Sequence, residues 1–193
     1  FLGSEYDDEL EECYTTMATK NVMRSRGVVG PLLGDSVYST APLAKKIALI
    51  ATKELLEKIA AEHRRGRRLL VGTTNLDAQR FVVWNMGAIA CKGDVDLFRK
   101  VTLASASLPI VFPPVHIKVE ADGKTYDEMH VDGGAITQVF STYKLMQNFD
   151  DSAKAKGLDP AKINATLYLI RNGFVAPHYK KTGDDLMSIA DRT

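Results

Sequence analysis

An amphipathic helical segment, followed after a short turn by a buried strand, constrains the fold of this chain more than any other feature. Over residues 42–63, apolar residues recur near the 3.6-residue period of an α-helix, with charged residues between them. A basic turn follows at 64–68, and residues 69–75 then form a short apolar run closed by turn residues, typical of a buried strand. Because both elements have an apolar face to cover, the sequence predicts helices packed in layers against a sheet.

Other segments repeat this alternation of helix and strand. Asp122-Gly123 lies between two strand-like runs, and this dipeptide is a strong signal for a tight β-hairpin turn. Together the segments predict a layered α/β fold with an inserted antiparallel hairpin. The further elements that we expect are a solvated helix face over 5–12, strands over 80–85, 116–120, 124–131 and 165–170, and helices over 96–105 and 142–156.

The composition bears on the class of protein and on its partners. The 193 residues favour a single domain, and a hydrophobic content of 45% supplies a core of normal size. The 25 basic and 24 acidic residues leave a net charge of +1, so a nucleic-acid partner, which normally needs a basic face, is not expected. No apolar run reaches the ~20 residues of a membrane-spanning helix. Cys13, Cys91 and the histidines show no metal-ligand spacing, and neither a metal nor another cofactor is expected.

Asp132 is the first residue that could carry chemistry. It stands in the sequence His-Val-Asp-Gly-Gly over 130–134, at the end of a predicted strand. Gly133 and Gly134 allow the backbone to approach a substrate closely and to adopt turn conformations that other residues resist. Without any resemblance to guide the interpretation, Asp-Gly-Gly is also a common turn, so a catalytic role and a structural role both stay open.

Ser105 and Ser107 lie in a segment, 103–114, that runs from small residues into a proline-bounded apolar loop. Such a segment is expected where a helix end packs tightly and leads into the wall of a pocket. A serine nucleophile elbow needs glycines on both sides, in the pattern G-x-S-x-G, so that a strand can turn sharply into a helix. That pattern occurs nowhere in the chain, and residues 34–38 come nearest while lacking the second glycine.

His130 would be the general base of a catalytic triad if the chain held one. Strand alternation places Glu128, His130 and Asp132 on one face, with His130 and Asp132 ~6.6 Å apart along the strand. Two residues at that separation in a regular strand do not hydrogen-bond directly, and a histidine isolated on a strand is more often structural than catalytic. Glu128 and Asp132, ~13 Å apart, are also too distant for the paired carboxylates of a glycosidase.

Three segments together resemble the patatin-like phospholipase family: 72–77, 104–114 and 130–134. Their order and spacing are similar to the part of that family's core that follows its nucleophile. The opening residues 1–7 and the stretch 35–43 also look like bacterial members, so that the resemblance spans nearly the whole chain. On this resemblance, residues 1–193 are the C-terminal portion of a patatin-like domain.

The resemblance implies a three-layer α/β/α hydrolase, truncated here on its N-terminal side, that uses a serine–aspartate dyad without histidine. Asp132 would be the catalytic aspartate, supported by Gly133 and Gly134, and would accept the serine proton directly. The serine elbow and the glycine-rich oxyanion loop would precede Phe1, so that the isolated chain would not hydrolyse esters.

The same resemblance implies the substrate and the setting. The substrate would be a phospholipid or another acyl ester, with transient contact at a membrane surface. The compartment, cytoplasmic or membrane-associated, and the oligomeric state stay open. The alternative is a patatin-like module that has lost its nucleophile and serves in binding or as a scaffold. A degenerate elbow upstream of Phe1 would favour that alternative.

Overall fold

A computed structural model describes residues 6–16, 18–25, 36–137, 150–151, 153–164, 166 and 168 of the chain. The chain divides into two compact units, which are treated separately below. The described residues up to Ile136 belong to the first unit, which contains the strands and α-helices whose bounds follow. The second unit, from Thr137 onward, has helical residues at 150–151 and 153–155 and a 3-10 helix, η2 (Pro160–Lys162).

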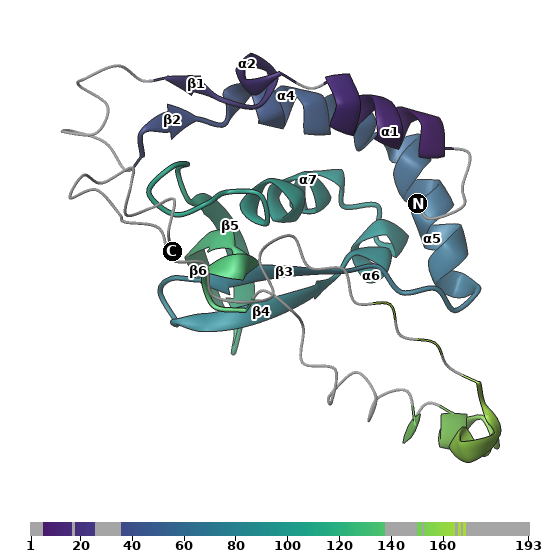
Figure 1. Cartoon of the computed structure of the whole chain (residues 1–193). Helices are drawn as coiled ribbons and strands as arrows, with labels where there is room; N and C mark the ends of the chain where they lie inside the picture. The colour runs from purple at the N-terminus through teal and green to yellow at the C-terminus, as the bar shows by residue number, and fades with distance from the viewer. Residues whose placement is uncertain are drawn as a thin grey trace, which may run out of the picture. The chain divides into compact units, whose positions relative to one another are not determined.

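A four-stranded sheet forms the framework of the first unit (Figure 1). Its strand order is β4-β3-β6-β5, and each neighbouring pair of strands is antiparallel. The prediction of these four strands is confirmed, with boundaries that differ from the predicted ones by one residue or less. The bounds are β3 (Leu70–Asn75), β4 (Arg80–Asn85), β5 (Val115–Ala121) and β6 (Lys124–Asp132).

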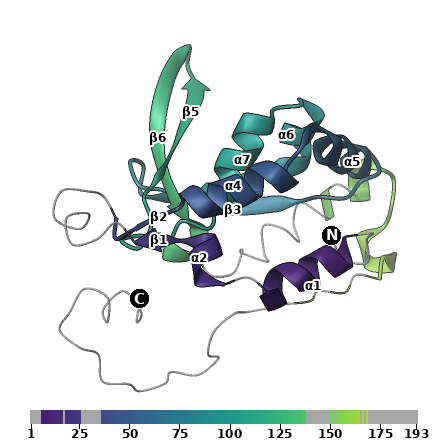
Figure 2. The same cartoon turned by 90° about the horizontal axis from the view of Figure 1, so that it is seen from above.

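The hairpin of β5 and β6 turns at Asp122 and Gly123, as the sequence predicts. Both residues have positive φ angles, 51° and 72°, which is the geometry of the tight turns that match strand twist. The hairpin extends beyond the helices (Figure 2). Strand β6 also pairs with β3, but only over a short ladder that begins at Thr73↔Asp132.

The hydrophobic core lies between one face of this sheet and several helices. The strand register places Val71, Trp84 and Ile117 on the same sheet face, and all three pack in the core. Figure 1 shows α7 lying over the sheet, and the core includes residues of α5, α6 and α7. The protein is therefore mixed α/β, with helices layered on an antiparallel sheet. The helix bounds are α4 (Ala41–Ile50), α5 (Lys53–Arg64), α6 (Met86–Cys91) and α7 (Val95–Ala104).

The prediction of one continuous helix over 42–63 is wrong, because two helices, α4 and α5, occupy these residues. The first ends at Ile50, and its C-cap residue Ala51 has a ψ angle of 72°, which is not helical. The side-chain oxygen of Thr52 then accepts a hydrogen bond from Leu55 N (3.3 Å) and caps α5. Arg99 of α7 donates to two carbonyls at the end of α4 (2.8 and 2.9 Å), which satisfies acceptors that the break exposes.

Removing the Thr52 cap should destabilise the fold. We expect Thr52→Ala to lower the free energy of unfolding by about 1 kcal/mol, because the N–H group of Leu55 loses its acceptor. The cap also affects Glu54: a hydrogen bond from its own backbone and a second one from Thr52 lower the pKa of its carboxyl group. Urea unfolding measures the loss, and Thr52→Ser, which keeps the hydroxyl, is the control. Equal losses in both variants would contradict the capping explanation.

The first unit also contains short elements near its N-terminal end. The acidic opening forms a helix whose described side chains are exposed, as predicted. Of the opening residues 1–7 that enter the resemblance, only Tyr6 and Asp7 are described. The bounds of these elements are α1 (Asp7–Thr16), α2 (Thr19–Val22), β1 (Arg24–Ser25) and β2 (Tyr38–Ser39).

Two predicted elements fall largely beyond the described ranges. The helix predicted over 142–156 is described only in part, and five of those residues, at 150–151 and 153–155, are helical. The strand predicted over 165–170 lies outside the described residues except for Thr166 and Tyr168, which belong to no regular element. Within the described ranges, no helix is long and apolar enough to cross a membrane.

Candidate functional site

Asp132 ends strand β6 and caps the short 3-10 helix η1 (Gly133–Ala135). Its backbone N–H donates to the carbonyl of Ser107 (2.9 Å), which anchors the strand end to the loop after α7. Its carboxylate Oδ1 accepts a hydrogen bond from Gly134 N (2.7 Å). The other carboxylate oxygen, Oδ2, has no hydrogen-bond partner among the described residues, and the side chain is partly exposed. One oxygen is therefore fixed by the Gly134 N–H group, and the other makes no hydrogen bond to the part of the chain that the structure describes.

Gly133 and Gly134 are needed for space rather than for a left-handed backbone. Neither has a positive φ angle, so the expectation that they supply turn conformations closed to other residues is wrong. A Cβ atom at Gly133 would lie 2.8 Å from the carbonyl oxygen of Gly72 and 2.8 Å from a ring carbon of Phe81. A Cβ atom at Gly134 would lie 3.1 Å from Oδ1 of Asp132. The two glycines thus let η1 pack against β3 and let the carboxylate fold back onto the Gly134 N–H group.

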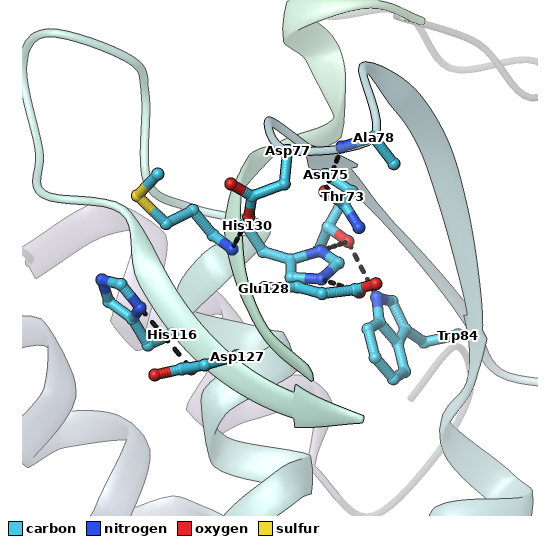
Figure 3. Close-up of polar contacts among 10 residues, drawn as sticks. Thr73, Asn75, Asp77, Ala78, Trp84, His116, Asp127, Glu128 and His130 are labelled. Atoms are coloured by element: carbon cyan, nitrogen blue, oxygen red, sulfur yellow. Dashed lines mark hydrogen bonds and ion pairs between the residues drawn. The ribbon is translucent and has the colours of Figure 1, made fainter. Parts of the chain in front are cut away.

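Four polar side chains, referred to below as the cross-strand relay, are joined by hydrogen bonds across the sheet (Figure 3). One of them, Thr73, is the ladder partner of Asp132. Trp84 of β4 donates through Nε1 to Oγ1 of Thr73 on β3 (2.8 Å). The same Thr73 oxygen lies 2.9 Å from Nδ1 of His130 on β6. His130 Nε2 lies 3.1 Å from Oε2 of Glu128. Thr73 and His130 are fully buried, whereas the Glu128 side chain is 22% exposed.

The two outer hydrogen bonds of the relay have a fixed direction. An ionised carboxylate only accepts hydrogen bonds, so His130 Nε2 carries the proton and donates to Glu128. The indole N–H group of Trp84 can only donate, so the Thr73 oxygen accepts from it. The contact between His130 Nδ1 and Thr73 Oγ1 (2.9 Å) forms with either partner as the donor, because a hydroxyl both donates and accepts. Both ring nitrogens are thereby occupied, and the ring makes its bonds to Thr73 and Glu128 rather than to Asp132, as strand geometry predicts.

The relay contains the three groups of a nucleophilic triad, but its hydroxyl is not accessible to solvent. The three groups belong to Thr73, His130 and Glu128. A hydroxyl, an imidazole and a carboxylate follow one another, as in serine hydrolases with a histidine base. The Thr73 hydroxyl, however, is fully buried and already accepts a hydrogen bond from Trp84. Because no substrate reaches this hydroxyl, the geometry of the relay favours a structural role.

Ser107 lies beside Asp132 in a geometry unsuited to a nucleophile. Its side chain is fully buried, and its Oγ donates to the carbonyl of Leu103, one turn earlier in α7 (2.8 Å). Ser105 is the C-cap of the same helix. The segment 103–114 instead contributes the Ser107 carbonyl that holds the backbone of Asp132. The sequence did not predict this contact, because it joins a loop to a distant strand.

The end of β3 and the turn after it are also tied to β6. Asp77 accepts a hydrogen bond from Met129 N through Oδ2 (2.7 Å). Asn75 is fully buried and accepts from Ala78 N through Oδ1 (2.9 Å). Its Nδ2 atom has no partner among the described residues. These polar residues fix the turn between β3 and β4 against the strand that carries Asp132.

Neither metal ligands nor known relatives identify a function directly. In the part of the chain that the structure describes, no group of three or more His, Cys, Asp or Glu residues could hold a metal ion. Compared with known proteins, the sequence matches no family model, and no curated protein matches it. Function is therefore inferred from the geometry around Asp132 and from the resemblance of the motifs.

Proposed function

We propose that this chain is the C-terminal part of a patatin-like serine lipid acyl hydrolase and that Asp132 is its catalytic base. The observation that carries this proposal is the arrangement of the Asp132 carboxylate. Oδ1 is held by Gly134 N (2.7 Å), whereas Oδ2 has no partner among the described residues. A carboxylate that is oriented at one oxygen, and whose other oxygen is bound by none of the described residues, is suited to accept a proton from a group brought to it.

The contacts of His130 support a dyad rather than a triad. Both ring nitrogens are hydrogen-bonded, to Thr73 and to Glu128, and the ring is fully buried. A general base must come within roughly 2.6–3.2 Å of the group whose proton it removes. Asp132 is partly exposed and meets this requirement more readily than the buried histidine.

In the proposed reaction, a serine hydroxyl from outside the described residues lies next to Oδ2 of Asp132. Asp132 accepts the hydroxyl proton while the serine oxygen attacks the acyl carbonyl, and backbone N–H groups stabilise the oxyanion. Each such donor is typically worth about 100- to 1,000-fold in rate. Asp132 then returns the proton to the leaving alcohol, which leaves an acyl-serine. A water molecule, deprotonated by Asp132, then attacks the acyl-serine, and Asp132 passes that proton to the serine oxygen as the acid leaves.

The proposal extends to the fold and the substrate. The helices and antiparallel sheet of the first unit would be one part of a three-layer α/β/α domain, completed by residues that precede Phe1. The substrate is an acyl ester of a lipid, reached by transient contact with a membrane surface.

The Asp132→Asn substitution in the full-length protein tests this proposal. We expect turnover of a soluble acyl ester to fall by about 100- to 10,000-fold, because the general base is lost. A full-length protein that hydrolyses no acyl ester would instead favour the alternative, a nucleophile-less module that binds a partner or serves as a scaffold.

A further inference from the structure

The cross-strand relay lies where the sheet is joined over its shortest ladder. β3 and β6 pair over three residue pairs, the first of them Thr73↔Asp132, whereas β5 and β6 pair over seven. A short backbone ladder specifies its register weakly. A slip of one residue would turn the side chains of β6 to the opposite face of the sheet, Asp132 included.

The relay reinforces this short ladder through side chains. Thr73 faces Asp132 in the backbone register, yet its hydroxyl contacts His130, so the side-chain bond crosses the ladder diagonally. Trp84 holds the Thr73 oxygen from β4, and Glu128 holds the far side of the imidazole ring from β6. The complete set of hydrogen bonds forms in one register only, because a slip would separate Thr73 from the ring.

We propose that Glu128 and His130 are positioning residues, which act through Thr73 to hold the Asp132 carboxylate in place. This inference rests on the proposed role of Asp132. Both Thr73 and His130 lie close to Asp132. Thr73 is the ladder partner of Asp132, and His130 precedes Asp132 by two residues on β6. Without Glu128, the buried ring would have an unpaired N–H group and would reorient to satisfy it. Thr73 would then lose its partner, and the end of β6 would shift.

A second histidine–carboxylate pair on the same hairpin provides a matched control (Figure 3). His116 Nδ1 lies 3.5 Å from Asp127 Oδ1, and both side chains are more than half exposed. Asp127 and Glu128 are neighbours in β6, so their side chains point to opposite faces of the sheet. Asp127→Ala therefore removes a carboxylate bound to histidine without touching the relay.

The test compares Glu128→Ala, Glu128→Gln and Asp127→Ala in the full-length protein, by ester turnover and by the amide resonance of Gly134 after isotope labelling of glycine. The Gly134 N–H group donates to Asp132 Oδ1 (2.7 Å), so its resonance reports the position of the carboxylate. We expect Glu128→Ala to move this resonance and to lower kcat by about 10- to 100-fold with little change in KM. Glu128→Gln keeps an acceptor for His130, so its kcat and its Gly134 resonance should be close to those of the wild-type protein. Asp127→Ala should change neither kcat nor the Gly134 resonance.

A folded Glu128→Ala protein with the wild-type kcat and the wild-type Gly134 resonance would overturn the positioning role. An equal loss of kcat in Asp127→Ala would also overturn it, because the loss would then come from the hairpin as a whole. Thr73→Val breaks the relay at a second point and should reproduce the effect of Glu128→Ala. If the wild-type protein hydrolyses no ester, the proposed function fails, and the Gly134 resonance still decides whether the relay positions Asp132.

Discussion

Asp132→Asn in the full-length protein is expected to lower kcat for a soluble acyl ester by about 100- to 10,000-fold while the fold is kept. The asparagine side-chain oxygen can still accept the hydrogen bond that Gly134 N donates to Oδ1 (2.7 Å), so η1 keeps its cap. The neutral amide, however, cannot take up the serine proton. Because the lost interaction belongs to the transition state, kcat and kcat/KM should fall together.

Asp127→Asn is the matched control for this experiment, since Asp127 lies on the same strand with a side chain 54% exposed. We expect it to keep the wild-type turnover. Thermal unfolding of both variants separates a loss of chemistry from a loss of structure. A folded Asp132→Asn protein that retained its turnover would remove Asp132 from the mechanism.

Gly133→Ala is expected to destabilise the fold more than the addition of one methyl group suggests. The added Cβ atom would lie 2.8 Å from the carbonyl oxygen of Gly72 and 2.9 Å from its carbonyl carbon, both backbone atoms of β3. A strand backbone cannot rotate aside as a side chain can, and overpacking of this kind costs typically about 1–3 kcal/mol. For a chain of this size, that loss lowers the midpoint of thermal unfolding by roughly 2–12 °C.

Gly134→Ala is the control, because it also replaces a glycine of η1 but brings the new Cβ atom close to a side chain instead of a backbone. The nearest atom to its Cβ would be Oδ1 of Asp132 at 3.1 Å, the end of a side chain that can rotate. We therefore expect a smaller fall in the unfolding midpoint than for Gly133→Ala, measured by circular dichroism. If the two variants unfolded at the same temperature, contact with the backbone of Gly72 would not explain the glycine at 133.

The elements that the sequence predicts correctly have their determinants within a few residues. The alternating strands and the Asp122-Gly123 turn are of this kind, and the positive φ angles of both turn residues agree with the prediction. The break before Thr52 was not predicted, because it depends partly on Arg99 from a helix distant in sequence. Helix α6 was also missed, since six residues are too few to show a helical period.

The candidate site shows the same limit more clearly. Alternation places Glu128, His130 and Asp132 on one face, and the ring in fact bonds the longer glutamate side chain instead of Asp132. Its other partner, Thr73, lies 57 residues earlier on a different strand, so no local pattern could reveal it. The need for a glycine at position 133 is equally non-local, because it depends on how closely the backbone of β3 approaches Gly133. Motif patterns thus singled out Asp132 as the candidate, while its contacts with Ser107, Gly134 and Thr73 became visible only in the structure.

The proposed dyad joins Asp132 to a serine that precedes Phe1. Covalent labelling with a serine-reactive fluorophosphonate, applied to this chain and to the full-length protein and followed by peptide mapping, tests it most directly. We expect label only on the full-length protein, at a serine that precedes Phe1. Label on a serine within residues 1–193 would place the nucleophile elsewhere and contradict the dyad. Absence of label from both proteins would also contradict it and would favour a module without catalytic activity.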